Sequence, residues 1–159
     1  MKNILVPLDL SEVSTAVVDA AVPMARAFGA QVYLYYVMRP AVVVNEFSAY
    51  VDEQSTHPDP EVDKILAKLV ADLKAQGVAA VAEQAVGIPV EEILEKAESL
   101  IPEYIIMGSH GHTSFYDLLV GSTTAGVLKR ARQPVLIVGA NETPATREEA
   151  HSLAGAAKV

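Results

Sequence analysis

Five short apolar runs rich in β-branched residues alternate with stretches of helical period along this chain of 159 residues. The runs are Asn3–Leu8, Gln31–Val37, Val78–Val86, Tyr104–Met107 and Pro134–Val138. Strands of a parallel sheet that helices cover on both faces are buried on both sides, so they read as continuous apolar segments. Because such alternation requires right-handed crossovers, we expect an α/β fold: a single domain with an open, parallel five-stranded sheet sandwiched by helices.

The stretches between the runs carry helix start and stop signals. Ser11 is the expected N-cap of the first helix and Gly29 its stop. Asp59-Pro60 opens the second helix, and its expected inward residues are Ile65, Leu66, Leu69, Val70 and Leu73. The third helix is expected over Pro89–Leu100. The fourth begins at Gly121-Ser122 and ends in the cations Lys129 and Arg130, which suit a helix C-terminus.

Composition excludes several classes of protein. Apolar residues make up 51% of the chain, which is enough for a packed core and excludes global disorder. With 20 acidic and 12 basic residues the formal charge is −8, which disfavours binding to nucleic-acid backbones. The chain has no cysteine, so a disulfide scaffold and thiolate chemistry are excluded and structural zinc becomes improbable.

No membrane or export segment is visible in the sequence. The first apolar run, Ile4 to Leu8, is too short to span a bilayer and is interrupted by Pro7. It also lacks the basic start, long apolar stretch and small-residue cleavage site of a signal peptide. We therefore expect a cytoplasmic protein without membrane insertion.

The segments that follow the predicted strands hold the candidate functional residues, because ligands of open parallel sheets bind beyond the carboxyl ends of the strands. Asp9 and Ser11 follow the first strand, and a glycine-containing loop from Gly108 to Thr113 follows the fourth. Gly121 then opens the last helix, followed by the hydroxyl residues Ser122, Thr123 and Thr124. Glycine lets a phosphate approach the backbone closely, and a helix N-terminus favours an anion. Ordinary strand ends and helix caps are the alternative reading of each residue alone.

Two familiar nucleotide motifs are absent. A dinucleotide-binding fold would place G-x-G-x-x-G after the first strand, where this chain has Asp9-Leu10-Ser11. A P-loop would need G-x-x-x-x-G-K-[S/T], and no such string occurs. Any phosphate loop therefore follows the fourth strand.

That arrangement resembles the ATP-binding branch of the universal stress protein family, whose signature is G-x2-G-x9-G-[S/T]. Gly108, Gly111, Gly121 and Ser122 match it without a gap. The first-strand motif Pro7-x-Asp9-x-Ser11 and the closing run Gln133–Val138 also look like the family's, whereas Leu10 stands where the family often has glycine. The resemblance implies a Rossmann-like nucleotide-binding domain over residues 1–139, followed by a tail over 140–159 with weak structural signals.

The resemblance also implies the ligand, ATP, often with a divalent cation (Mg or Mn) at the phosphates. Carried onto this chain, Pro7, Asp9 and Val37 would line the base and ribose. The residues expected to hold ribose and phosphates are Met107, Gly108, Gly111, Gly121, Ser122 and Thr123, with His112 facing a phosphate. We expect ATP to bind more tightly than AMP, and a stress-response regulator acting as a nucleotide-dependent switch on a protein partner that the sequence does not identify.

Other readings of these residues stay open. Asp9 suits a ribose hydroxyl, an ion-bound water or a structural cap on its own loop. His110 and His112 make a poor zinc site without a cysteine or clustered carboxylates, so they read as exposed loop residues. No catalytic residue is expected, because the phosphate loop lacks a lysine and a dedicated base. A slow ATPase that uses Asp9 is the alternative function, and the intact glycine spacing argues against a module without nucleotide.

Two further segments give expectations about assembly. The uncharged run Val135, Leu136, Ile137 and Val138 is expected at a sheet edge and, as in the family, in a homodimer about a two-fold axis. Residues 140–159 folding back over that edge are the alternative. The connection over residues 39–57 is too apolar for a solvated loop, so we expect it to cover the pocket, form a subunit contact or pack on the second helix, with a mobile portion near Gln54–His57.

Overall fold

The computed structural model describes residues 1–44, 48–52, 56–109 and 120–139. The seven strands in these residues are β1 (Asn3–Leu8), β2 (Gln31–Met38), β3 (Val42–Val44), β4 (Ala49–Val51), β5 (Ala80–Val86), β6 (Tyr104–Gly108) and β7 (Val135–Val138). The helices are α1 (Val13–Phe28), α2 (Pro60–Ala75), α3 (Pro89–Leu100) and α4 (Ser122–Arg130). All five predicted strands are present, and the third begins two residues later than predicted.

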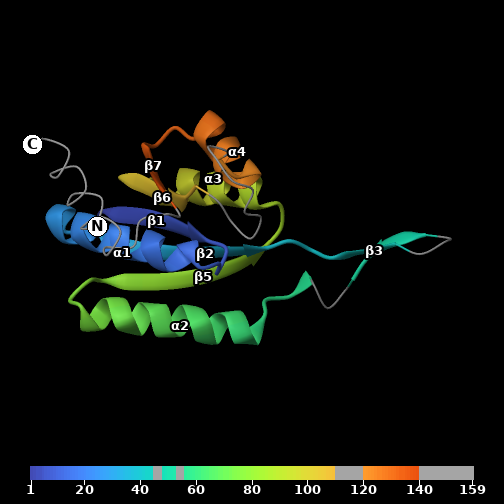
Figure 1. Ribbon diagram of the computed structural model, residues 1–159, viewed down its shortest axis with the longest axis horizontal. Coiled ribbons are helices and arrows are strands. Elements are labelled where there is room, and N and C mark those ends of the chain that lie inside the picture. The colour runs from blue at the N-terminus through green and yellow to red at the C-terminus, as the bar shows by residue number, and fades with distance from the viewer. Residues whose placement is uncertain (45–47, 53–55, 110–119, 140–159) are drawn as a thin grey trace, which may run out of the picture.

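The main sheet is parallel and has the strand order β5-β2-β1-β6-β7. From β1 the chain first builds outward through β2 to β5, and then returns to the other side of β1 for β6 and β7 (Figure 1). The strand order therefore reverses between β1 and β6, which is where open α/β sheets bind their ligands. The order also places β7 at an edge, as the sequence predicts.

Helices cover both faces of this sheet. On one face α1 and α2 pack on the strands around Ile4, Leu34 and Ile106. On the other face α3 and α4 pack around Leu5, Ile105 and Met107. The predicted α/β sandwich is thus confirmed (Figure 1). None of the helices in the described segments is long and apolar enough to cross a membrane.

Most predicted helix ends are confirmed. Asp59 caps α2 by accepting a hydrogen bond from the N–H of Glu61 at 2.8 Å, and Gly29 ends α1 in the left-handed region with φ 59°. Ser11, however, is not the N-cap of α1, which begins at Val13. The N-cap position is Glu12 and no side chain caps the helix, while the N–H and the hydroxyl of Ser11 both donate to the Asp9 carboxylate.

The predicted inward face of α2 is wrong at one residue. Ile65 is 47% exposed, whereas Leu66 and Leu73 are buried against the sheet. Consecutive helix residues point about 100° apart, and here Leu66 takes the inward position while Ile65 faces solvent. The N-terminus of α2 is also fixed to β5, because the Gln84 side chain exchanges hydrogen bonds with the backbone of Asp59 at 2.8 and 2.9 Å.

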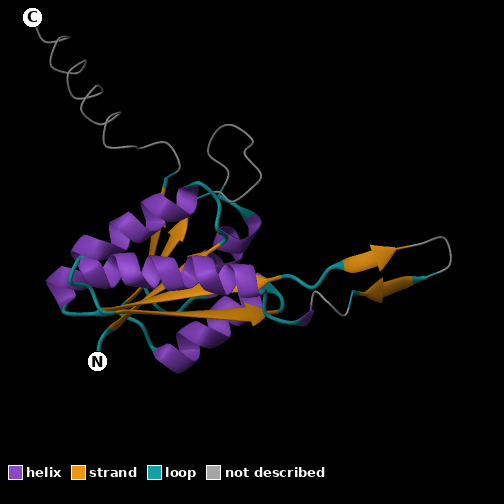
Figure 2. Cartoon of the chain, turned by 90° about the horizontal axis from the view of Figure 1, so that it is seen from below, coloured by secondary structure: helices purple, strands orange, loops and turns teal. Residues whose placement is uncertain are grey.

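A two-stranded antiparallel hairpin, β3–β4, is the feature that the sequence does not predict. Within the described residues its two strands form a sheet of their own, paired from Val42↔Val51 to Val44↔Ala49. Figures 1 and 2 both show it projecting beyond the carboxyl end of the sheet, away from α2. The prediction that residues 39–57 pack on α2 is therefore wrong for the hairpin. A subunit contact through this segment stays a prediction. The predicted mobile portion lies largely outside the described residues.

Candidate functional site

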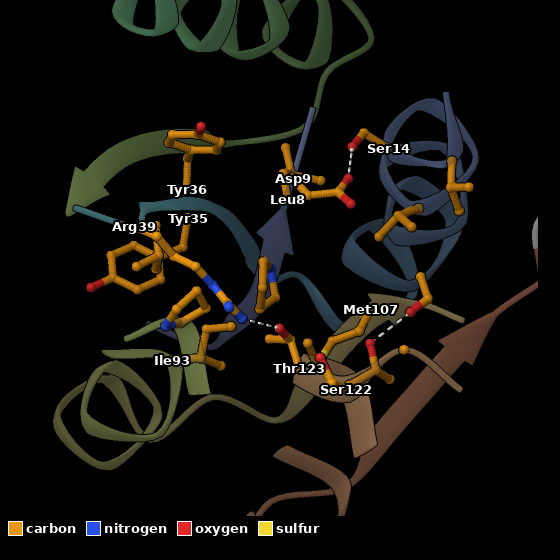
Figure 3. A pocket seen from close by; sticks show the side chains of 18 residues that line it. Leu8, Asp9, Ser14, Tyr35, Tyr36, Arg39, Ile93, Met107, Ser122 and Thr123 are labelled. Carbon is orange, nitrogen blue, oxygen red and sulfur yellow. Dashed lines mark hydrogen bonds between the residues drawn. The ribbon is translucent and has the colours of Figure 1, made fainter. Parts of the chain in front are cut away.

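A cavity of about 530 Å³ opens at the carboxyl end of the sheet, at the reversal of strand order. It is lined by the ends of β1, β2 and β6 and by the first turns of α1, α3 and α4 (Figure 3). The lining residues are Pro7, Leu8, Asp9, Val13, Ser14, Val17, Tyr35, Tyr36, Val37, Arg39, Pro89, Ile93, Met107, Gly108, Gly121, Ser122, Thr123 and Thr124. The size falls within the roughly 300–1,000 Å³ typical of small-molecule sites.

The first turn of α4 points into this cavity. The first bond within the helix runs from the N–H of Ala125 to the Gly121 carbonyl at 2.8 Å. The N–H groups of Ser122, Thr123 and Thr124 lie before this first bond, so the helix itself offers them no carbonyl acceptor. The helix dipole adds positive potential at the same point. Such a terminus binds anions readily.

Other groups fix this terminus in place. The Thr124 hydroxyl is buried and donates to the Gly108 carbonyl at 2.9 Å, so it holds α4 against the end of β6 rather than facing a ligand. Gly121 donates its N–H to the Ser109 carbonyl at 2.7 Å and adopts φ −54° and ψ 151°, which other residues also adopt. Gly121 therefore contributes a small size at the cavity, not an unusual backbone conformation.

Asp9 organises the loop between β1 and α1. Its Oδ1 accepts from the Ser11 N–H at 3.0 Å, the Ser11 hydroxyl at 2.6 Å and the Ser14 hydroxyl at 3.2 Å. The next residue, Leu10, has φ 59°, a left-handed conformation that costs an L-residue roughly 1–2 kcal/mol. The positive φ explains why glycine would suit position 10. The three hydrogen bonds show that Asp9 has a structural role in its own loop.

Two tyrosines line the cavity next to β1. Burial, together with the charges of Asp59 and Asp9, raises the pKa of Tyr36. Burial, followed by the charges of Glu92 and Glu83, raises the pKa of Tyr35 as well. Both phenols are therefore protonated at neutral pH. Tyr35 is packed into the sheet at 2% exposure, and both tyrosines also reach the cavity.

Arg39 is a lining residue that sequence reasoning missed. Its guanidinium Nη2 donates to the Thr123 hydroxyl at 3.4 Å, so it reaches across from the end of β2 to the start of α4 (Figure 3). Asp9 points instead toward Ser14 on α1. Among the described lining residues, Arg39 supplies the positive side-chain charge and Asp9 the negative one. A cation directly after an apolar strand was the signal in the sequence.

The structure brings most of the predicted site residues together. The residues that line the cavity are Pro7, Asp9, Val37, Met107, Gly108, Gly121, Ser122 and Thr123. Gly111 and His112, and with them His110, lie outside the described residues. Within the described ranges no group of three or more His, Cys, Asp or Glu residues could hold a metal ion by itself.

Comparison with known proteins assigns the family. The model of the universal stress protein family matches residues 1–139. Universal stress protein MJ0531 of Methanocaldococcus jannaschii is 34% identical over 142 residues, 86% of this chain and 81% of that protein. Universal stress protein YxiE of Bacillus subtilis is 31% identical over 144 residues, 86% of this chain and 97% of that protein.

Solved structures show the same fold. A universal stress protein of Archaeoglobus fulgidus in complex with dAMP has a TM-score of 0.65 at 20% identity, covering 86% of this chain and 97% of its own. A universal stress protein in complex with cAMP has a TM-score of 0.65 at 24% identity, and the match covers 87% of this chain and 96% of that protein. Because the family model spans most of the chain, this protein belongs to the universal stress protein family.

Proposed function

We propose that this chain is an ATP-binding regulatory protein whose nucleotide state alters a surface recognised by a partner. The observation that carries the proposal is the first turn of α4, where N–H groups that come before the first hydrogen bond within the helix face a cavity of nucleotide size. Universal stress proteins in complex with dAMP and with cAMP support a nucleotide as the class of ligand. We further propose that the site binds the triphosphate ATP more tightly than the monophosphate AMP.

The cavity fits the two halves of such a ligand. Val37 and Ile93 give an apolar surface suited to a base, whereas Ser122, Thr123 and Arg39 gather polar groups suited to phosphates. Asp9 suits a ribose hydroxyl. A divalent cation would take ligands from the phosphates and at most one carboxylate, which is how Mg²⁺ is commonly held in phosphate sites. Asp9 is the residue that would contribute that carboxylate.

Calorimetry with ATP tests the assignment of the cavity. Gly121→Val places a branched side chain at the start of α4, where the backbone tolerates valine, so ATP binding should weaken by more than about 2 kcal/mol. Gly139→Val is the matched control, since among the described residues no atom lies within 4 Å of the added Cβ there. Equal ATP affinity in wild type and Gly121→Val would refute the site.

Slow ATP hydrolysis at the same site is not what we propose. A general base must be able to reach and deprotonate the attacking water. The Oδ1 of Asp9 already accepts three hydrogen bonds from its own loop, which suits a positioning role. We therefore expect binding without sustained turnover. Phosphate release over many turnovers, lost in Asp9→Asn, would contradict this expectation.

We also propose that the functional unit is a homodimer built on β7. This strand lies at the sheet edge, and its Leu136 side chain is 39% exposed. An uncharged edge strand tends to pair with another chain. Antiparallel pairing with the same strand of a second copy closes the assembly about a two-fold axis.

Sedimentation tests this interface. Leu136→Lys places a charge at the centre of the contact and should yield monomers at micromolar concentration. Deletion of the chain after Gly139 removes the tail over residues 140–159, which lies outside the described residues, and should leave the dimer intact. A wild-type chain that sediments as a monomer would refute the dimer.

A further inference from the structure

Arg39 leaves the sheet from a rigid point at the mouth of the cavity. It follows Met38, the last residue of β2, which pairs with Val86 of β5. The Met38 carbonyl also accepts from the N–H of Gly87 at 2.9 Å. The next residue, Pro40, disfavours helical backbone at Arg39 and holds the chain extended. The base of the side chain is thus fixed while the side chain itself is exposed.

The contact of the guanidinium is weak by the standards of this molecule. Its donor–acceptor distance to the Thr123 hydroxyl is 3.4 Å, long for an N–H···O bond. Arg26 instead donates to the Gln76 carbonyl at 2.7 Å, and Arg130 binds both oxygens of Glu91 at 2.6 and 2.8 Å. Little interaction energy is therefore lost when Arg39 turns from Thr123 toward another acceptor.

The place where Arg39 ends is electrostatically unfavourable for a cation. Thr123 lies in the first turn of α4, at the positive end of the helix dipole, where anions are stabilised and cations are not. The guanidinium and the helix terminus both present donors to the same part of the cavity (Figure 3). An anion between them would satisfy both, and a guanidinium matches phosphate oxygens with two parallel hydrogen bonds.

We propose that Arg39 binds the phosphate chain of the nucleotide and makes affinity depend on the number of phosphates. The inference rests on the proposed nucleotide-binding function and names a specificity-determining residue within it. On a chain of formal charge −8, this guanidinium and the start of α4 offset the repulsion that a polyphosphate would meet. AMP and adenosine gain less, because they offer one phosphate or none.

Calorimetry on the full chain tests the proposal with ATP, AMP, adenosine and inorganic tripolyphosphate. Arg39→Gln should weaken ATP at least tenfold, weaken AMP less and leave adenosine unchanged. Arg39→Lys should restore part of the ATP affinity, because charge returns without the planar pair of donors. Arg26→Gln removes an arginine at the opposite end of the sheet and should bind ATP as wild type does. Tripolyphosphate binding weaker than that of ATP identifies the nucleotide, not free polyphosphate, as the ligand.

Several outcomes would overturn the inference. Unchanged ATP affinity in Arg39→Gln would show that the guanidinium does not touch the phosphates. Tighter ATP binding would show that Arg39 closes the empty cavity through Thr123 and competes with the ligand. An equal loss for adenosine and ATP would place Arg39 at the base or ribose. Each of these leaves the proposed function standing, whereas a wild-type chain that binds no nucleotide would overturn both.

Discussion

The two ends of the central sheet are built from the same strands and helices, yet they are finished differently. At the amino end, the turns after α1, α2 and α3 each contain a residue with positive φ: Gly29 at 59°, Gly77 at 76° and Ile101 at 47°. These turns close on themselves, with the Ala30 N–H bonded to the Ala25 carbonyl at 2.9 Å. At the carboxyl end the first turn of α4 faces a cavity.

The two ends of the sheet differ in how the helix termini there use their backbone hydrogen-bonding groups. A helix C-terminus that turns sharply into a strand satisfies its carbonyls locally, so the amino end gains stability and has little left to offer a ligand. A helix N-terminus that follows a strand keeps donors available, so the carboxyl end gains a binding surface. Substitutions at the amino end should therefore change stability, and those at the carboxyl end should change affinity.

The largest stability effect is expected at the amino end, from Gly29→Val. A β-branched residue at φ 59° is strained even though the added Cβ would meet no atom within 4 Å. The free energy of unfolding, measured in urea, should fall by about 2 kcal/mol while ATP affinity stays unchanged. Gly139→Val carries the same side chain in open space at an ordinary φ and should cost far less. Equal losses in the two variants would contradict the strain argument.

Substitution of Asp9 should change both stability and affinity, because this residue lies at the carboxyl end of the sheet but also supports its own loop. In Asp9→Asn the charge-assisted hydrogen bonds to Ser11 and Ser14 weaken, so stability should fall by about 1–2 kcal/mol together with ATP affinity. Asp19→Asn, on the exposed side of α1, is the matched control and should change neither. Full stability in Asp9→Asn would mean that the loop is held by other contacts.

Ile101→Gly should stabilise the protein. Ile101 caps α3 at φ 47° and is 76% exposed, so glycine relieves backbone strain and loses little burial. The gain should be about 1 kcal/mol in the free energy of unfolding. Ile88 at the other end of α3 is 66% exposed with φ −86°, so Ile88→Gly should destabilise through greater freedom of the unfolded chain. Shifts of the same sign in both variants would refute the argument.

The smallest effect is expected midway between the ends, where Lys96 binds both oxygens of Glu83 at 2.7 and 2.8 Å. Burial alone would raise the pKa of Glu83, but hydrogen bonds from Lys96 and Tyr33 outweigh it and the pKa is lowered. A carboxyl group whose pKa is lowered by folding stabilises the protein at pH values above its unfolded pKa of about 4.3. This stabilisation is lost as the pH falls through the folded pKa.

The pair is measured by comparing wild type with Glu83→Gln in urea at pH 7 and pH 3. The difference at pH 7 should be below about 1 kcal/mol, because the Glu83 side chain is 40% exposed and solvent screens the pair. It should shrink at pH 3, because that pH lies below the unfolded pKa of about 4.3 and the stability that a lowered folded pKa contributes is lost progressively there. A difference that does not depend on pH would show that shape, not charge, carries the contribution.

Sequence patterns predicted the parts of the molecule that depend on local periodicity. The strand runs, the Asp59 cap and the stop at Gly29 need only neighbouring residues to be recognised. The β3–β4 hairpin was missed because two runs of three residues are too short to show a strand period. Ser11 was misassigned because α1 begins at Val13, one residue beyond the start that a Ser11 cap requires, and the Ser11 side chain bonds to Asp9 in its own loop.

The candidate site was predicted where it follows strand ends and missed where it depends on distant contacts. Gly108, Gly121 and Ser122 stand in a spaced motif and line the cavity. Arg39 and Thr123 are 84 positions apart in the chain, so their contact follows only from the strand order. Thr124 resembles its neighbouring hydroxyl residues in sequence, yet its bond to Gly108 gives it a structural role.

Amide chemical shifts measured during an ATP titration locate the nucleotide site on the sheet, because they report on both of its ends in one experiment. We expect saturable shifts at Ser122 and Thr123, and smaller ones at Asp9, while the amides of Ala30 and Val78 in the amino-end turns stay unchanged. No shift at Ser122 and Thr123 at millimolar ATP, or shifts confined to the amino-end turns, would contradict a nucleotide site at the carboxyl end.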